Sequence, residues 1–546
     1  MSARVDSAAA SASAALGPAQ RAAVFDRLRA GARFDLAVIG GGATGLGVAL
    51  DAAVRGFTVL LVEAGDFAQG TSSRATKLVH GGVRYLAQGN LTLVREALRE
   101  RAAILANAPH VAQRLPFVVP GYHLWEPGWY GVGLKAYDML AGERGIGGTR
   151  WLGARRTLEL LPGARAEGLR GGVCYWDGQF DDARLAVLIA RTAAARGASV
   201  LNHAPVVGLR HEGGQLRGLA IRDAESGETI EVEAGCVVNA TGVWVDAVRA
   251  MDDGDAAGES GPAMVAPSQG VHLVVDQAFL PGSHALMVPR TADGRVLFAV
   301  PWLGKLILGT TDTPRDDIVA EPRPFGHEVD FILGEAARYL RRAPGRSDVR
   351  SAWVGLRPLV RPMGEAAQTK SISREHTIEV ARSGLVTVIG GKWTTYRAMA
   401  EDVLERCMAR GLLAPRPGGR TERLPLVGAA PGRSLAGPPG EHLYGSEAAA
   451  VRALPGADEV LWRDAESGQP GLSAAMVRFA VRQEGARSVE DVLARRSRVL
   501  FLDAAVAAGC ADAVARVVAQ ELGPGFDAAA SRSAFDELAQ RYRALP

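Results

Sequence analysis

Three glycines near the start of the chain have the spacing of a turn that can hold a phosphate group. Gly40, Gly42 and Gly45 follow an apolar run at residues 34–39, which is typical of a buried parallel strand. Such glycines allow a tight turn, a close approach of the backbone to a pyrophosphate, and close packing of a helix on the strand. Glu63 ends a second apolar run, where its carboxylate can accept hydrogen bonds from ribose hydroxyls. Together these residues predict a dinucleotide site.

The elements around these glycines agree with that prediction. Residues 46–55 have the composition of a helix and residues 58–62 that of a strand, so strand, turn, helix and strand follow in order. A second match to the glycine pattern, at residues 131–136, follows no strand and leads to no strand with an acidic end. We interpret it as structural. One nucleotide site is therefore expected, which argues against separate FAD and NAD(P) sites.

Two later segments favour FAD over NAD. Residues 235–242 form an apolar strand that ends in Ala-Thr-Gly, and residues 385–389 form another, followed by Gly-Gly-Lys and a helix start near Thr394. An NAD site is normally complete within one compact Rossmann unit, whereas strands this far downstream suggest a longer cofactor lying across the sheet. A helix N-terminus near a flavin would also stabilise its anionic reduced form.

Further short motifs show a resemblance to a known family of flavoproteins. From residue 34 to about 400 the chain resembles the FAD-dependent glycerol-3-phosphate dehydrogenases, of the glycine-oxidase-like (D-amino-acid-oxidase-like) flavoprotein superfamily. The matching motifs occur in the same order, at residues 40–45, 71–77, 78–86, 180–185, 239–242, 269–272, 309–312, 355–359, 373–376 and 390–397. A weaker match at 489–498 extends into the C-terminal region. The resemblance implies an α/β fold, with a discontinuous Rossmann-like FAD-binding domain, an inserted antiparallel-sheet substrate domain and a C-terminal helical domain.

The resemblance also implies which residues form the site. FAD would be held without a covalent bond by Gly40, Gly42, Gly45, Glu63, Thr71, Ser72, Ser73, Lys77, Leu78, His80, Gly81, Gly82, Val206, Ala240, Thr241, Gly242, Thr310, Asp312, Gly391, Lys392, Thr394 and Thr395. Substrate would be bound by Arg84, Tyr85, Arg357, Arg374 and Lys392. Arginine suits a phosphate because its planar fork bonds two oxygens at once, and Arg357 is the strongest candidate because Gly355 before it and Pro358 after it are expected to hold a stiff, sharply defined turn. Tyr85 either hydrogen-bonds the substrate or only packs.

The catalytic roles would fall to His80, His272 and Arg357. Oxidation of a secondary alcohol by a flavin removes a hydride from carbon and a proton from the hydroxyl, and histidine can take that proton because it titrates near neutral pH. Gly81 and Gly82 leave room for ligands beside His80. The sequence does not choose between the two histidines as the base. Seven other histidines are expected to be structural, namely His110, His123, His203, His211, His284, His327 and His442.

The reaction implied by the resemblance is the oxidation of sn-glycerol 3-phosphate to dihydroxyacetone phosphate, with hydride transfer to FAD and electrons passed on to a membrane quinone. An oxidase that reduces dioxygen to hydrogen peroxide would use related residues and stays open. A non-catalytic flavin-binding protein is disfavoured, because it would not need the full set of arginines and histidines.

The order of elements predicts how the chain is divided. Short strands at 272–275, 285–289, 296–301 and 305–309 predict an antiparallel sheet over the flavin, and helical periodicity marks 448–454, 472–484, 489–499, 504–522 and 533–544. The expected parts are a flexible extension with an amphipathic helix near 20–30 (1–33), FAD-binding segments (34–95, 175–255, 370–414), substrate-domain segments (96–174, 256–369), a Pro/Gly-rich linker (415–440) and a helical domain (441–546).

Composition excludes several other classes. With 62 Lys and Arg against 59 Asp and Glu, the net charge of +3 is too small for binding driven by a basic nucleic-acid face. The four cysteines are widely spaced, which excludes zinc ribbons and Cys-run iron–sulfur motifs, and no metal site is expected. No apolar run approaches the ~18 residues of a membrane-spanning helix. The oligomeric state stays open, a homodimer included.

One aromatic segment suggests attachment to a membrane surface. Residues 122–151 interleave aromatic side chains with basic ones, namely Tyr122, Trp125, Trp129, Tyr130, Tyr137 and Trp151 with Lys135, Arg144 and Arg150. Aromatic rings favour the headgroup level and basic groups are attracted to anionic lipid. The alternative is that these rings pack as ordinary core. Since a quinone is lipid-soluble, we expect a cytoplasmic protein peripherally associated with the inner face of the cell membrane, and the helix near 20–30 is the second candidate anchor.

Overall fold

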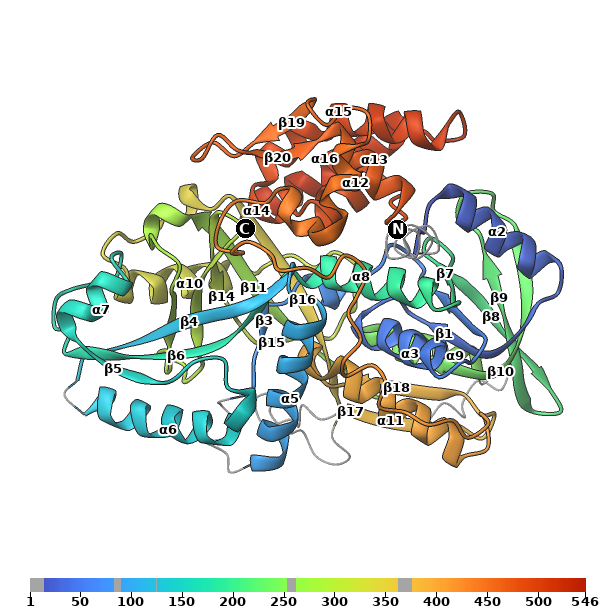
Figure 1. Ribbon diagram of the computed structural model, residues 1–546, viewed down its shortest axis with the longest axis horizontal. Helices are drawn as coiled ribbons and strands as arrows, with labels where there is room; N and C mark the ends of the chain where they lie inside the picture. The colour runs from blue at the N-terminus through green and yellow to red at the C-terminus, as the bar shows by residue number, and fades with distance from the viewer. Residues whose placement is uncertain (1–13, 83–89, 124, 253–261, 362–375) are drawn as a thin grey trace, which may run out of the picture.

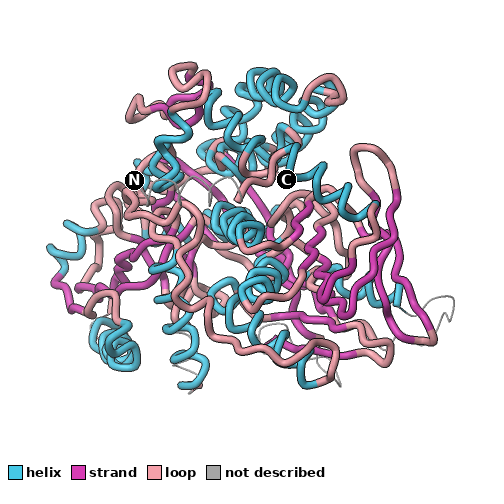
Figure 2. The backbone as a smooth tube through the Cα atoms, turned by 45° about the vertical axis from the view of Figure 1, so that its right-hand side comes forward, coloured by secondary structure: helices cyan, strands magenta, loops and turns pink. Residues whose placement is uncertain are grey.

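The structure, a computed structural model, describes residues 14–82, 90–123, 125–252, 262–361 and 376–546. Two sheets lie beside each other, and the C-terminal helices cover them from one side (Figure 1). A second view also shows the strands in two groups, with helices between and around them (Figure 2). The chain passes between the two sheets several times, so neither sheet comes from one continuous stretch of sequence.

The first sheet joins distant segments, as the strand pattern predicted. It contains β1 (Arg33–Ile39), β2 (Val59–Val62), β7 (Ser199–Leu201), β8 (Val206–Glu212), β9 (Gln215–Arg222), β10 (Thr229–Asn239), β17 (His376–Val380) and β18 (Val386–Gly390). β1 pairs in parallel with β2 and β10, and β10 pairs in parallel with β18. Asn239, at the end of β10, therefore lies between Ile39 and Thr387. The carboxyl ends of these strands meet at one edge, where a ligand binds in open α/β sheets.

The alternating side chains of β1 explain how both faces of this sheet are covered. Leu36 and Val38 belong to the core cluster of the helices, and Ala37 and Ile39 to a cluster on the other face with α2 and β9. The helices are α2 (Pro18–Arg29), α3 (Ala43–Val54), α8 (Asp182–Ala195), α9 (Val245–Asp252) and α11 (Tyr396–Ala409).

The N-terminal helix corrects one expectation. Instead of forming an appendage with its arginines on the polar side, α2 packs Phe25 and Leu28 into the core. Arg21 is buried as well, where it pairs with Asp223 and donates to the carbonyl oxygen of Asn202. A buried arginine needs partners from distant residues, and a helical pattern cannot reveal them.

The second sheet confirms the predicted inserted sheet and adds one parallel pair. Its strands are β3 (Leu78–Val79), β4 (Ala112–Gly121), β5 (Arg150–Gly153), β6 (Gly171–Phe180), β11 (Val265–Asp276), β12 (Ala285–Val288), β13 (Leu297–Trp302), β14 (Lys305–Gly309), β15 (Thr313–Pro314) and β16 (Ser351–Val360). Its pairs are antiparallel except β12 with β4. The helices beside it are α5 (Leu91–Asn107), α6 (Glu126–Ala141), α7 (Ala154–Leu160) and α10 (Gly326–Tyr339).

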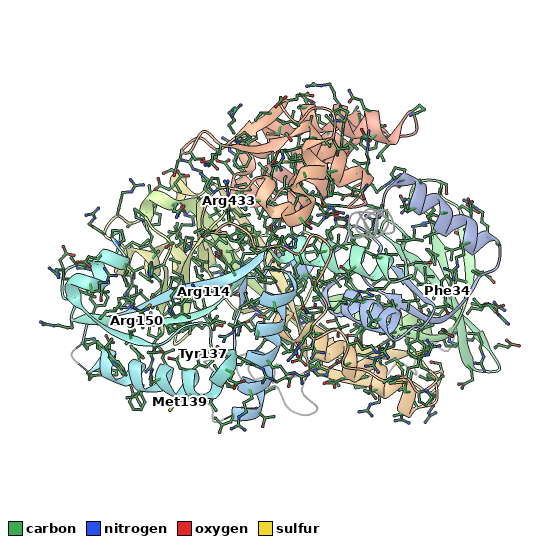
Figure 3. All side chains as sticks on the ribbon, in the orientation of Figure 1. Phe34, Arg114, Tyr137, Met139, Arg150 and Arg433 are labelled. Carbon is green, nitrogen blue, oxygen red and sulfur yellow. The ribbon has the colours of Figure 1, made fainter. Side chains whose placement is uncertain are left out.

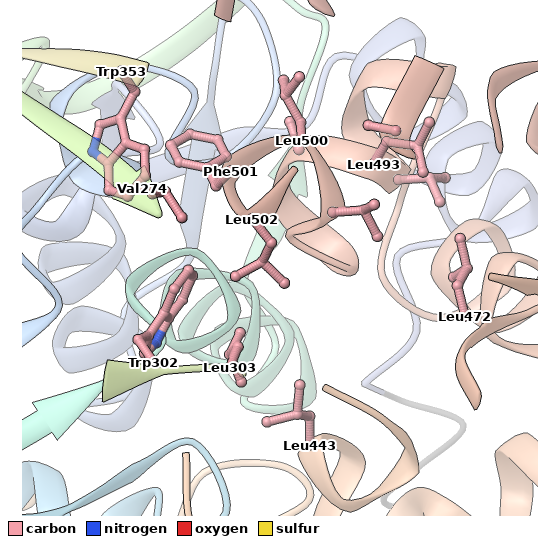
Figure 4. Packing of buried hydrophobic residues seen from close by; sticks show 14 of the residues in the cluster. Val274, Trp302, Leu303, Trp353, Leu443, Leu472, Leu493, Leu500, Phe501 and Leu502 are labelled. Atoms are coloured by element: carbon pink, nitrogen blue, oxygen red, sulfur yellow. The ribbon is translucent and has the colours of Figure 1, made fainter. Parts of the chain in front are cut away.

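The C-terminal part shares a continuous core with the second sheet. Figure 4 shows Phe501 and Leu502 packed toward Trp353 and Trp302 of the sheet. Its helices are α12 (Ala448–Arg452), α13 (Ala474–Arg482), α14 (Val499–Leu502), α15 (Ala504–Leu522) and α16 (Ala528–Arg543). The predicted helix at 489–499 is present over residues 489–496, where Asp491–Arg496 has π-helical hydrogen bonding, and it ends before Arg498, which has φ +66°. A hairpin that the sequence did not predict, β19 (Val460–Arg463) with β20 (Pro470–Ser473), lies beside these helices.

The segment read as a linker is bound to the body of the protein. The backbone N–H of Leu426 donates to the carbonyl oxygen of Asn107, and that of Leu435 donates to the side chain of Gln113. Leu424, Leu426 and Leu435 are buried. The Pro/Gly-rich composition therefore indicates a segment without regular secondary structure, but this segment is not a flexible linker.

Candidate active site

A cavity of about 840 Å³ is lined by residues from both sheets. The predicted residues on its wall are Gly40, Gly42, Glu63, Thr71, Ser72, Leu78, His80, Val206, Ala240, Thr241, Gly242, His272, Thr310, Asp312, Arg357, Gly391, Lys392 and Thr394. This volume is at the upper end of the range for small-molecule and cofactor sites, about 300–1,000 Å³. Residues from at least six separate motifs therefore line one cavity.

The glycine turn has the geometry that a dinucleotide requires. Gly40 has a φ of +110°, which favours glycine, and a Cβ on Gly45 would lie 2.0 Å from the carbonyl oxygen of Gly40. Gly45 therefore serves the close packing of α3 on β1, behind the cavity wall. Gly42 is the N-cap of α3, and no side chain of the cap closes this end of the helix. Such a helix end presents backbone N–H groups and a positive dipole to a pyrophosphate.

Glu63 lies at the end of β2, on the cavity wall. Its carboxylate accepts hydrogen bonds from the backbone N–H groups of Gly41, at 2.6 Å, and Gly65, at 2.9 Å. Burial raises the pKa of Glu63, while the two N–H donors act in the opposite direction. These contacts fix the direction of the side chain, and a carboxylate has lone pairs left for ribose hydroxyls.

The ends of β10 and β18 extend the cavity beyond the nucleotide motif. Ala240, Thr241 and Gly242 follow β10, and Gly391 and Lys392 follow β18 into a 3-10 turn, Trp393–Thr395, that leads into α11. The indole N–H of Trp393 donates to the carbonyl oxygen of Ser72 at 2.7 Å and links this turn to the first motif. The residues present therefore fit a cofactor that reaches from the glycine turn across the sheet, as FAD does.

The second sheet contributes Arg357 to the opposite part of the cavity. The guanidinium group of Arg357 donates to Asp312, at 3.0 Å, and to the carbonyl oxygen of Thr311, at 2.9 Å. A Cβ on Gly270 would lie 2.2 Å from this guanidinium group, so the glycine leaves the space that the group occupies. Arg357 lies within the strand β16, opposite Ser268 of β11, and not in the expected turn, so its direction is fixed by hydrogen bonds to β11 and to the segment after β14.

His272 lies on the cavity wall in an aromatic stack. Its ring is 5.4 Å from that of Trp353, at 19°, and Nε2 is 2.8 Å from the hydroxyl of Thr76. Nδ1 has no hydrogen-bond partner among the described residues. Burial, and then the positive charges of Lys77 and Arg357, hold the pKa of His272 well below its usual range. The ring is therefore neutral near pH 7 and can accept a proton.

Six predicted residues do not line the cavity, namely Gly45, Ser73, Lys77, Gly81, Gly82 and Thr395. Lys77 is the clearest case. Its ammonium group is fully buried, pairs with Asp182 at 2.7 Å and lies over the rings of Trp302, Trp353 and Phe501. Burial lowers the pKa of Lys77 to about 7. It stands behind His272, so it acts on the cavity through its charge and not by lining it.

Other residues fall outside these predictions. Arg84, Tyr85 and Arg374 lie outside the described residues, and their roles stay predictions. Asp177 and Trp244 also line the cavity, although no sequence motif indicated them. So does a group of apolar side chains, namely Phe117, Tyr175, Met287, Val296 and Phe298. Their strands were visible in part as apolar runs, but a run does not show which face meets the cavity.

The fold and this site define the class of the protein, an FAD-dependent oxidoreductase. A family model described as "FAD dependent oxidoreductase" matches residues 35–400, and one described as "C-terminal domain of alpha-glycerophosphate oxidase" matches residues 441–529. The mitochondrial glycerol-3-phosphate dehydrogenase SDP6 of Arabidopsis thaliana is 41% identical over 528 residues, covering 89% of this chain and 82% of the relative. The chain belongs to the FAD-dependent glycerol-3-phosphate dehydrogenase family.

Three further comparisons agree. The human mitochondrial glycerol-3-phosphate dehydrogenase is 39% identical over 538 residues, covering 92% of this chain and 73% of the relative. The crystal structure of the glycerol-3-phosphate dehydrogenase from Bacillus halodurans, complexed with FAD, is 31% identical with a TM-score of 0.72, covering 94% of this chain and 95% of that one. The L-alpha-glycerophosphate oxidase of Mycoplasma pneumoniae shares the fold, with a TM-score of 0.54 and 16% identity over 72% of this chain and 99% of that one.

The purified protein should be yellow and should release its FAD on denaturation. All four cysteines are buried and none of them lines the cavity, so no thiol is placed to attach a flavin. The measurement is denaturation followed by separation of the chain from the chromophore, which should migrate as FAD. Colour that remains with the precipitated chain would contradict non-covalent binding.

Proposed function

We propose that this chain oxidises sn-glycerol 3-phosphate to dihydroxyacetone phosphate and passes the electrons from FAD to a membrane quinone. One observation carries the proposal: the nucleotide turn, a fixed arginine and a neutral histidine meet on the wall of a single cavity. The names of the relatives support the substrate. The phosphate needs a cation, and the secondary alcohol needs a proton acceptor beside a hydride acceptor.

Each step of the proposed reaction can then be assigned to a residue or to the cofactor. Bound FAD supplies the hydride acceptor at N5. Arg357 offers its charge to the substrate phosphate, and its bonds to Asp312 and Thr311 fix its direction before the substrate arrives. His272 takes the hydroxyl proton: its neutral ring lies on the cavity wall, with Nε2 2.8 Å from the hydroxyl of Thr76. His80, whose Nδ1 accepts from the N–H of Gly82, is the alternative base.

Between pH 8 and pH 6, the rate of substrate oxidation should show no fall caused by protonation of a histidine base, although Lys77, whose pKa is lowered to about 7, gains its charge in this range. An ordinary histidine, with a pKa near 6.5, becomes protonated in this range and stops acting as a base. His272 should remain neutral, because its pKa is lowered by burial and by neighbouring cations. Anaerobic flavin reduction at saturating substrate, followed from pH 6 to pH 8, measures this. A fall centred near pH 6.5 that persists in Lys77→Met, where the neighbouring charge no longer titrates, would assign the proton transfer to another group.

Exposed side chains on α6 support the membrane part of the proposal. Trp125 and Trp129 are 63% and 73% exposed, and Val132, Met139 and Trp151 are exposed beside them. Figure 3 shows Met139 pointing away from the body of the protein, with Tyr137 on the inner side of α6. The alternative was that these aromatic residues pack as ordinary core. Of the six, only Tyr137 is fully buried. Across the described residues, no helix has the length and apolar character needed to cross a bilayer.

The electron acceptor distinguishes this proposal from an oxidase. The test uses enzyme reduced anaerobically with sn-glycerol 3-phosphate, which is mixed with either a short-chain quinone or dissolved oxygen. The proposal expects much faster return of the oxidised flavin spectrum with quinone. Faster reoxidation by oxygen, with stoichiometric hydrogen peroxide, would make the chain an oxidase.

A further inference from the structure

A cluster of buried polar groups joins the exposed helix α6 to the turn that carries His80. Its centre is Asp177 on β6, which is 2% exposed and lies on the cavity wall. Its carboxylate accepts hydrogen bonds from Arg101 on α5, at 2.9 Å, and from the hydroxyl of Tyr137 on α6, at 3.1 Å. It also accepts from the backbone N–H of Gly81, at 3.2 Å. None of these groups has a role in the chemistry proposed above.

The contact with Gly81 places Asp177 directly behind a proposed catalytic group. β3 and β6 are antiparallel neighbours, with Val79 opposite Gly178, so the chain leaves β3 beside Asp177. Gly81 then donates to Asp177, and Gly82 donates to the ring of His80. The two hydrogen bonds therefore hold the turn and the imidazole in one arrangement.

Packing confines the same turn from the other side. A Cβ on Gly81 would lie 2.1 Å from the hydroxyl oxygen of Tyr137 and 2.4 Å from Cδ2 of Leu98. Tyr137, Leu98 and Val94 form a small buried cluster between α5 and α6. The backbone at Gly81 is thus fixed between this cluster and the Asp177 carboxylate.

We infer that Asp177 is a positioning residue for His80, held in place by Tyr137 of α6 and Arg101 of α5. The inference rests on the proposed function, in which His80 lies beside the reacting alcohol. An aspartate suits the task because its two oxygens can accept all of these donors. An asparagine keeps one acceptor oxygen, and the Tyr137 hydroxyl can turn to accept from its NH2 group, but it carries no charge and leaves the buried guanidinium group of Arg101 without its ionic partner.

The test is the rate of flavin reduction by sn-glycerol 3-phosphate, measured anaerobically per bound FAD. Asp177→Asn should lower this rate about 10- to 100-fold, the size of effect that a misplaced reacting group produces, while KM changes little. Tyr137→Phe keeps the ring and removes one hydroxyl, and it should lower the rate about 2- to 10-fold, the equivalent of one hydrogen bond.

Asp51→Asn is the matched control. Asp51 is equally buried and pairs with Arg55, but it does not line the cavity, so this variant should reduce at the wild-type rate. Wild-type rates per bound FAD in Asp177→Asn, or in Tyr137→Phe should Asp177→Asn not fold, would overturn the inference. Equal losses in Asp51→Asn would also overturn it. A wild-type enzyme that sn-glycerol 3-phosphate does not reduce would instead refute the proposed function and, with it, this role of Asp177.

Discussion

Replacing Arg357 with alanine should raise the KM for sn-glycerol 3-phosphate about 10- to 150-fold, because a lost charge-assisted contact is worth roughly 1.5–3 kcal/mol. The guanidinium group is partly exposed in the cavity and is oriented by Asp312, so alanine removes a charge that is already in position. FAD should stay bound, since the glycine turn and Glu63 belong to the other sheet. Steady-state kinetics with a soluble dye acceptor measure the KM, and flavin absorption measures the bound FAD.

Arg350→Ala is the matched control for this variant. Arg350 directly precedes β16, the strand that carries Arg357, and also pairs with an aspartate, Asp276. It lies outside the cavity lining, so its loss changes the net charge equally without touching the substrate. An unchanged KM in Arg357→Ala, or the same increase in Arg350→Ala, would remove Arg357 from the phosphate site.

Changing Trp125 and Trp129 together to serine should weaken binding to anionic vesicles at least about 10-fold. Each exposed indole ring that inserts at the headgroup level contributes on the order of 1–2 kcal/mol through the apolar area it buries. Activity with a soluble dye should be spared, because neither ring lines the cavity. Sedimentation with vesicles measures the binding. High salt should release part of the parent protein, since Lys135, Arg144 and Arg150 are exposed near the same helix.

The control for this pair is Ile318→Ser with Val319→Ser. These two apolar side chains are also exposed, but they belong to another segment of the chain. Replacing both with serine should leave sedimentation with the vesicles unchanged. If the tryptophan pair also sediments like the parent, α6 is not the anchor. The helix α2 is then a weaker second candidate than its sequence suggested, because Phe25 and Leu28 are already buried in the protein.

The nucleotide half of the site could be predicted because its residues act within their own turns. Gly40, Gly42 and Gly45 have roles that follow from spacing and local backbone geometry. The apolar strands at 235–242 and 385–389 are parallel neighbours, so their carboxyl ends lie at the edge of the sheet where ligands bind. The same holds for the strands of the second sheet, whose short apolar runs and turns are local signals.

The rest depends on partners far away in the sequence. Lys77 lies in a matched motif, yet it points to Asp182 and to aromatic rings from three distant segments. In the sequence, Asp177 cannot be distinguished from other polar residues in strands. Its role depends on donors that follow β3 or lie on α5 and α6. The buried pair of Arg21 with Asp223 is hidden for the same reason. Such contacts are set by tertiary packing, which periodicity and spacing do not describe.

The most direct test of the central claim is anaerobic mixing of the yellow protein with sn-glycerol 3-phosphate. The reaction proposed here predicts that the flavin absorption bleaches and that one dihydroxyacetone phosphate forms for each FAD reduced, while glycerol, which lacks the phosphate that Arg357 is proposed to hold, leaves the flavin oxidised. A flavin that stays oxidised with sn-glycerol 3-phosphate, although dithionite reduces it, would contradict the account.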